Sequence, residues 1–333
     1  MKRRSVTVWN HPSLFFTLLP RMTKTTSIEW TDHTLNFWWG CTKISEACRH
    51  CYAADIDRRF GPKLDSGQAH WGESVPRMDR RAEAETELAA LCKRFAKSGE
   101  QPPRIFVNSM SDWLDPEVPI AWLADLLVTL CKYPGPVYQL LTKRPAQFLP
   151  RLCEILELGG PAALIAEDWL AGDPPANFWI GTTVETQHRA NQRVPDLIAI
   201  PAKVRFLSCE PLLGPIALSA SLPINYQLST LNSSIHWIIA GGESGTAKGV
   251  SASHPDWFRS LRDQCALAAI PFFFKQWGSW YPLSTTDGRQ ILPFGHYIPP
   301  SPSVKGYGFM KSGKAAAGRL LDGREWNHFP NNF

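Results

Sequence analysis

The chain has 333 residues, 44% hydrophobic and 20% charged, which is an ordinary composition for a soluble globular protein with a large buried core. Its formal net charge of +5 is compatible with a nucleic acid or another phosphorylated substrate but does not require one. No apolar run approaches the length of a membrane span, and the eight cysteines do not resemble a disulfide framework, so we predict a cytoplasmic protein without a membrane partner.

The first residues imitate a secretory signal peptide only weakly. A basic start at 2–4 precedes an apolar run at 14–19, but that run is short. Pro20 and Arg21 stand where a small-residue cleavage site belongs. We therefore predict that residues 1–26 form a disordered N-terminal extension.

Short apolar runs alternate with helical patterns along the rest of the chain. After a first strand at 34–39, strands are predicted at 104–107, 137–141, 178–180, 204–207, 237–240 and 271–274. These runs are nearly continuous in apolar residues, as is typical of parallel strands buried on both faces. Helices are predicted at 80–97, 118–132, 145–158, 186–199 and 254–268.

This order of elements predicts an α/β protein whose parallel strands and outer helices form a partial (β/α) TIM-like barrel. A doubly wound open sheet is the alternative. The barrel is favoured because the predicted strands lead directly into polar residues, and barrel enzymes build their sites at the carboxyl ends of several strands. We assign 27–280 to this domain, 211–235 to a loop insertion, and 281–333 to an irregular C-terminal extension packed on the barrel.

Three cysteines lie close together after the first strand. Cys41, Cys48 and Cys51 have C-x6-C-x2-C spacing on a loop, which suits thiolate ligands of an iron–sulfur cluster. Three thiolates would leave one iron of a [4Fe-4S] cluster open. The alternatives are a zinc site completed by His50, His33 or a distant cysteine, and three thiols without a metal.

Three glutamates, Glu185, Glu210 and Glu243, each follow a predicted strand and are expected to face one cavity. They could hold the hydroxyl or amino groups of a ligand, or a metal. Alternatively, each caps the next helix or pairs with a cation on the same rim.

Cationic and glycine-rich segments follow other strands. Lys143, Arg144 and Lys275 could bind a carboxylate or phosphate, or pair with the glutamates. Gly241 and Gly242 allow close approach of a ligand to the backbone, although the segment is neither a P-loop nor a dinucleotide fingerprint.

Several ordered motifs resemble a phage and prophage family of unknown function, sometimes called three-Cys-motif proteins. The resemblance covers residue 27 to the C-terminus. Its motifs are 27–32 through 51–53, 141–145 (Leu-Thr-Lys-Arg-Pro), 181–185 (Gly-Thr-Thr-Val-Glu), 206–212, 241–245 (Gly-Gly-Glu-Ser-Gly), 272–278 and 316–324.

That family is similar to radical S-adenosylmethionine (SAM) enzymes. The resemblance implies a partial barrel of the radical SAM type, a [4Fe-4S] cluster on the three cysteines, and SAM on the open iron. Reductive cleavage of SAM would yield a 5′-deoxyadenosyl radical that abstracts hydrogen from an unknown substrate, with nucleic acid or a nucleotide-derived molecule as candidates. Implied partners are an electron donor such as a flavodoxin or ferredoxin and a phage-encoded protein.

Site roles are predicted on this basis. The predicted catalytic residues are Glu243, Lys275 and Cys209, with core packing or a fourth metal ligand as the alternatives for Cys209. The predicted cofactor-binding residues are Ser109, Asp112, Thr142, Lys143, Thr183, Glu185, Glu210, Gly241 and Gly242. The chain departs from radical SAM enzymes in two features. Those enzymes usually have C-x3-C-x2-C spacing, whereas six residues separate Cys41 from Cys48 here. They also often carry a Gly-Gly-Glu after the second strand, where this chain has Ser-Met-Ser-Asp at 109–112.

Two other functions fit the sequence. One is a metal-binding, nucleic-acid-binding protein without catalysis, which would use the basic rim and some of the fourteen tryptophans. The other is a zinc-dependent hydrolase.

Overall fold

The structure is a computed structural model. It describes residues 26–65, 67–221, 234–245, 249–284, 297–298 and 307–330. Nearly all of the predicted N-terminal extension and about half of the predicted loop insertion therefore lie outside the described residues.

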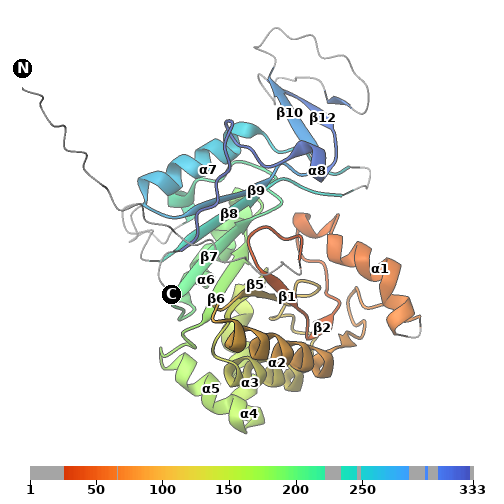
Figure 1. The fold of residues 1–333 in the computed structure, drawn as a ribbon, viewed down its shortest axis with the longest axis vertical. Helices are drawn as coiled ribbons and strands as arrows, with labels where there is room; N and C mark the ends of the chain where they lie inside the picture. Colours follow the sequence, from red (N-terminus) through yellow and green to blue (C-terminus); the bar gives the residue numbers. More distant parts are fainter. Residues whose placement is uncertain are drawn as a thin grey trace, which may run out of the picture.

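Seven parallel strands form one sheet that curls into a half-barrel (Figure 1). In sheet order they are β1 (His33–Leu35), β4 (Arg104–Val107), β5 (Val137–Thr142), β6 (Phe178–Thr183), β7 (Val204–Cys209), β8 (Trp237–Gly241) and β9 (Phe272–Gln276). The sheet order follows the chain order, so every crossover steps in the same direction. Because such crossovers are right-handed, they place their helices on one face of the sheet, which excludes the doubly wound alternative.

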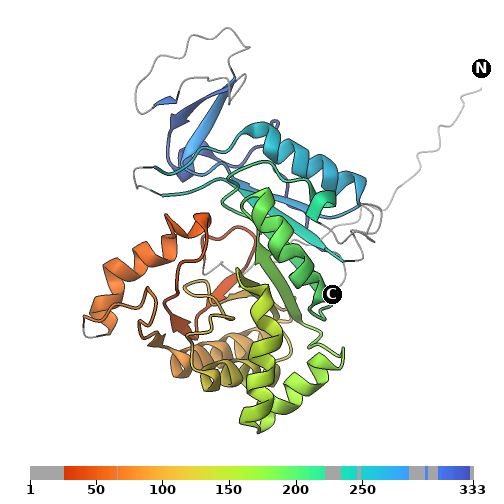
Figure 2. The same ribbon diagram turned by 180° about the vertical axis from the view of Figure 1, so that it is seen from behind.

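Helices cover the convex face of the sheet (Figures 1 and 2). They are α2 (Arg81–Ser98), α3 (Ile120–Lys132), α4 (Phe148–Leu158), α5 (Pro161–Leu170), α6 (Gln187–Ala199) and α7 (Pro255–Leu267). All five predicted helices are confirmed, while α5 was not predicted.

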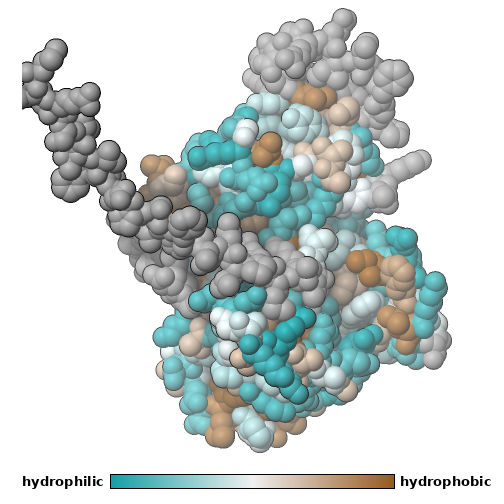
Figure 3. Space-filling model, viewed as in Figure 1, coloured by the Kyte–Doolittle hydropathy of each residue, from teal (hydrophilic) through white to brown (hydrophobic). Residues whose placement is uncertain are grey.

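The segment predicted as one strand at 34–39 is broken in two. After β1 the chain turns, and β2 (Trp38–Trp39) pairs antiparallel with β3 (Met78–Asp79). The cysteine loop then leads into α1 (Tyr52–Leu64), another helix that was not predicted. It stands apart from the helices on the sheet, and apolar residues gather over it on the molecular surface (Figure 3).

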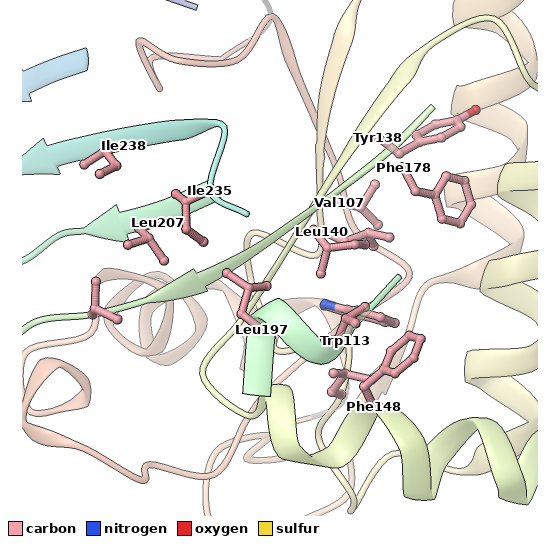
Figure 4. Close-up of a cluster of buried hydrophobic side chains, with 14 of the residues drawn as sticks. Val107, Trp113, Tyr138, Leu140, Phe148, Phe178, Leu197, Leu207, Ile235 and Ile238 are labelled. Atoms are coloured by element: carbon pink, nitrogen blue, oxygen red, sulfur yellow. The ribbon is translucent and has the colours of Figure 1, made fainter. Parts of the chain in front are cut away.

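The two-residue period of the strands divides the interior into two cores. On the convex face, residues such as Val107, Leu140 and Phe178 pack against the outer helices (Figure 4). On the concave face an aromatic cluster fills the half-barrel. Its members are Trp30, Phe106, Trp179, Phe206, Trp237 and Phe273, with Phe329 packed against them.

The C-terminal extension is more regular than predicted. Its described part contains a three-stranded antiparallel sheet of β10 (Trp280–Ser284), β12 (Tyr307–Lys311) and β11 (Tyr297–Ile298), followed by α8 (Lys314–Ala317). The chain then returns along β9, where the N–H of Phe274 donates to the carbonyl of Trp326 at 2.9 Å. Phe329 reaches the aromatic cluster, with its ring 5.2 Å from that of Trp237.

Candidate metal and ligand site

A cavity of about 600 Å³ lies at the carboxyl ends of the parallel strands. Its floor is the polar end of the concave face, where Thr183 and Ser208 follow the aromatic cluster along their strands. Most of the predicted site residues line it. They are Cys41, Cys48, Cys51, Ser109, Asp112, Thr142, Lys143, Thr183, Glu210, Gly242, Glu243 and Lys275.

The cysteine loop is anchored to the end of β4. Gly40 bridges to Ser111, and its N–H donates to the carbonyl of Met110 at 3.1 Å. Gly40 has φ +110°, and an added Cβ would overlap the carbonyl of His70, so this position requires glycine. The loop is thereby fixed so that all three sulfurs belong to the cavity wall.

The last cysteine of the loop lies at a helix terminus. Cys51 is the N-cap of α1, so it lies beside the positive end of the helix dipole. Cys48 ends a short 3-10 helix, Glu46–Cys48. The loop thus presents its thiols beside a local positive potential.

Two cations lie beside these thiols. Arg144 donates from Nη1 to Sγ of Cys41 at 3.5 Å and from Nη2 to the carbonyl of Thr42 at 2.7 Å. Burial would raise the pKa of Cys48, but the charge of Lys143 and local hydrogen bonds outweigh it, so this pKa is lowered. At Cys41, burial and Asp112 dominate and raise the pKa to about 12.

The described side chains do not form a ligand set for a single ion. Among the residues that the structure describes, no group of three or more His, Cys, Asp or Glu is arranged to hold a metal ion. Both histidines considered as zinc ligands have other contacts. Nδ1 of His50 lies 3.0 Å from Glu243, and the ring of His33 packs edge-on against Phe95.

Asp112 joins the ends of β4 and β5. It accepts hydrogen bonds from Thr142 Oγ1 at 2.6 Å, from the N–H of Lys143 at 2.9 Å and from Arg144 Nη1 at 2.9 Å. Its carboxylate is therefore occupied within the protein. Its direct effect is to hold Arg144 against the sulfur of Cys41.

Opposite the cysteine loop, Glu210 and Lys275 form an ion pair. Nζ of Lys275 lies 2.7 and 2.9 Å from the two carboxylate oxygens, and Gln276 also donates to Glu210. Gly241 lies beneath this pair, since an added Cβ would come within 3.2 Å of the Glu210 carboxyl carbon. This glycine supports the site but does not line the cavity.

Glu243 bridges the two sides of the cavity. One carboxylate oxygen contacts Nδ1 of His50 at 3.0 Å, and the other accepts from the N–H of Ser251 at 2.6 Å. The adjacent Gly242 packs so closely on the carbonyl of Trp277 that a Cβ would overlap it. The cysteine loop is thus tied to the β8 end of the sheet.

Besides Gly241, two predicted site residues do not line the cavity. Cys209 is fully buried on the convex face with Leu207, because strand alternation gives Ser208 the concave side. Burial also raises the pKa of Cys209, and its place outside the cavity does not suit the predicted catalytic role. Glu185 is fully buried and pairs with Arg193 of α6 at 2.8 Å, which makes it a structural residue rather than a cavity ligand.

Sequence reasoning missed several lining residues on the first third of the chain. Asn36 accepts from Ser109 Oγ at 3.2 Å and from the N–H of Met110 at 2.8 Å. Trp39 and Trp71 form part of the wall, as does Tyr52, whose hydroxyl donates to the carbonyl of Ser109 at 2.8 Å. Asn36 had a signal, since it follows Thr34 by two residues within the strand predicted at 34–39. Trp39, Tyr52 and Trp71 belong to segments after β1 whose course the sequence did not predict.

The chain is an α/β protein whose parallel half-barrel gathers thiols, cations and carboxylates in one cavity at its carboxyl edge, the usual place for a site in such folds. The chain belongs to a family of proteins of unknown function, DUF5131, whose family model matches residues 25–330. No curated protein and no solved structure matches the chain. In the described part of the chain, no helix has the length and apolarity to cross a membrane.

Proposed function

We propose that this protein is a cytoplasmic, phage- or prophage-type iron–sulfur enzyme of the radical SAM kind. In this proposal Cys41, Cys48 and Cys51 hold a [4Fe-4S] cluster, and SAM occupies the open iron. The observation that carries the proposal is that the three thiols line one cavity with cations and carboxylates at the carboxyl edge of a parallel half-barrel.

The donor set fits a cluster better than a single ion. Soft thiolates are the usual ligands of iron–sulfur clusters. Ligands of one ion must crowd around it, whereas the thiolates of a cluster each bind a different iron and lie further apart. The lack of a single-ion arrangement among the described residues is therefore compatible with a cluster. Arg144 and Lys143 balance the negative charge that such a group brings.

In this proposal the other polar residues of the cavity bind and orient SAM. Burial disfavours the ammonium form of Lys143, but the charges of Cys48 and Cys51 outweigh this effect, so its pKa is raised. This side chain can attract the carboxylate of SAM. The Glu210–Lys275 pair and Glu243 offer acceptors and donors to hydroxyl and amino groups.

The aromatic cluster beneath the floor closes the other end of the half-barrel and excludes water from that side. When bound, the cluster would supply one electron for reductive cleavage of SAM to methionine and a 5′-deoxyadenosyl radical.

The test is anaerobic reconstitution with iron and sulfide, followed by dithionite and SAM and an assay for 5′-deoxyadenosine. We expect about four iron and four sulfide per chain and formation of 5′-deoxyadenosine. Cys48→Ala should abolish both. Cys209→Ala is the matched control, because its sulfur lies on the opposite face of the sheet, and it should retain the cluster. A full cluster without SAM binding or cleavage would refute the radical mechanism.

A further inference from the structure

Helix α1 carries an apolar stripe that faces solvent. Its members are Tyr52, Ile56, Phe60 and Leu64, with exposed fractions of 47%, 36%, 46% and 54%. They are spaced four residues apart, so they lie on one face of the helix over about 18 Å.

The buried face of α1 has the opposite character. Its residues are Ala53, Asp57 and Gly61, and Asp57 pairs with the buried His70 at 2.9 Å. A surface helix normally buries its apolar face and exposes its polar one. In α1 the small and polar residues are inside and the large apolar residues are outside, which indicates that the outer face binds something.

The surface continues into the cysteine loop. Ile44 on that loop is 38% exposed, and Cys51 directly precedes the first residue of the stripe. Tyr52 and Ile56 belong both to the stripe and to the cavity wall. A partner bound here would lie against the loop that presents the three thiols. Figure 3 shows hydrophobic surface in the region of α1.

Exposed cations accompany the stripe on α1 and on the cysteine loop that precedes it. They are Lys43, Arg49, Arg58, Arg59 and Lys63. Asp55 neutralises only Arg58, at 2.9 Å, and Arg59 lies over the ring of Phe60 at 5.6 Å. An apolar centre with a basic border is complementary to an acidic protein.

We propose that the α1 surface, defined as the stripe, Ile44 and these cations, docks an acidic electron-transfer protein. This inference rests on the proposed function, because that function requires one electron from outside the chain. A flavodoxin in its hydroquinone form would give one electron to the cluster and become the semiquinone. Three of the five apolar residues of the surface are aliphatic, which favours a protein over a nucleic acid, whose interfaces are more polar.

The experiment compares two reductants on the reconstituted full chain. Dithionite is a small molecule that reduces the cluster without docking. The protein donors, an acidic flavodoxin and an acidic [2Fe-2S] ferredoxin, must dock first. The variants are Leu64→Ser and the double charge reversal Arg59→Glu with Lys63→Glu, none of which lines the cavity. Leu164→Ser on α5 is the matched control, since Leu164 is 65% exposed and remote in sequence from the cysteine loop.

Cluster reduction is followed by absorbance and electron paramagnetic resonance (EPR), so the readout does not depend on SAM cleavage. We expect both α1 variants to slow reduction by a protein donor about tenfold and to leave the dithionite reaction unchanged. The control should behave as the wild type. Loss of the dithionite reaction in the wild type would instead mean that the proposed function fails, and the docking surface with it.

Three results would overturn the docking surface alone. One is equal rates for wild type and variants with a protein donor. Another is no reduction of the wild type by either protein donor while dithionite succeeds. The third is saturable binding of a twenty-nucleotide single strand that is lost in the charge-reversal variant, with reduction by flavodoxin unaffected.

Discussion

At the scale of single residues, strand alternation decides which side chains can do chemistry. Ser208 lines the cavity, while its neighbour Cys209 packs in the convex core. The sequence pattern indicated the polar strand ends, but the prediction did not distinguish neighbouring residues that point to opposite faces of the sheet. Counting the period from Phe206 would have placed Ser208 and Glu210 on the concave side and Cys209 on the other.

The concave core is packed to its limit at Gly181. A Cβ at this position would overlap the ring of Phe206 on the neighbouring strand. We expect Gly181→Ala to lower the free energy of unfolding by about 1–3 kcal/mol, because a buried methyl group must displace the ring. Phe206→Leu should itself cost stability but should relieve the overlap, so the double variant should be more stable than the sum of the single effects predicts. Urea denaturation gives the free energy of unfolding of the wild type, the two single variants and the double variant. Strictly additive effects would contradict this packing.

A histidine makes stability depend on pH. Burial, together with the charge of Arg205, lowers the pKa of His236, whose Nδ1 accepts the N–H of Arg205 at 3.0 Å. The unfolded chain therefore takes up a proton at higher pH than the folded chain does. The contribution of neutral His236 to the free energy of unfolding is complete above the ordinary histidine pKa of about 6.5. It decreases as the pH falls below that value.

The matching measurement is urea denaturation between pH 8 and pH 5 for the wild type and His236→Asn. The variant should lose less stability on acidification than the wild type does. Parallel curves for the two proteins would show that His236 does not titrate in this way.

At the scale of elements, the C-terminal segment completes the half-barrel. Asn327 bridges to Phe273 of β9, and the indole of Trp237 donates to the carbonyl of His328 at 2.8 Å. Phe329 then packs on Trp237 and Phe273, and Arg104 of β4 lies over its ring at 3.9 Å. One short segment thus joins strands from opposite sides of the sheet.

We expect Phe329→Ala to lower the free energy of unfolding by about 1–3 kcal/mol, since it removes apolar area from the aromatic cluster. The same substitution at Phe60 on α1 should change stability by less than about 0.5 kcal/mol, because that ring is exposed. Chemical denaturation compares the two, and equal effects would mean that the C-terminal segment does not support the sheet.

The sequence predicted the central strands well, because fully buried parallel strands are recognisable as short apolar runs. It did not predict α1, whose exposed face is apolar and whose buried face holds Asp57 and Gly61, the reverse of the pattern used to recognise a surface helix. The sequence predicted that the C-terminal extension packs on the barrel but not that it runs along β9, since those contacts involve backbone groups that any sequence carries.

At the scale of the whole molecule, the strand order explains the site. A singly wound parallel sheet directs the loops of every strand to one edge, so the cysteine loop, Lys143, Glu210 and Lys275 meet although more than 200 residues separate the first from the last. The positions of the motifs at the predicted strand ends indicate that these residues meet at one edge of the sheet. The pairing of Glu185 with Arg193 could not be read from them, because a carboxylate at a strand end can turn toward either face.

The central claim is that three thiols leave one iron of a cluster open to a ligand in this cavity. EPR of the reduced, reconstituted protein with and without SAM tests it most directly. We predict a [4Fe-4S] signal that changes on addition of SAM and shows hyperfine coupling to SAM labelled with ¹⁷O at its carboxylate. A signal that is indifferent to SAM, or a protein that retains zinc and no iron, would contradict the claim.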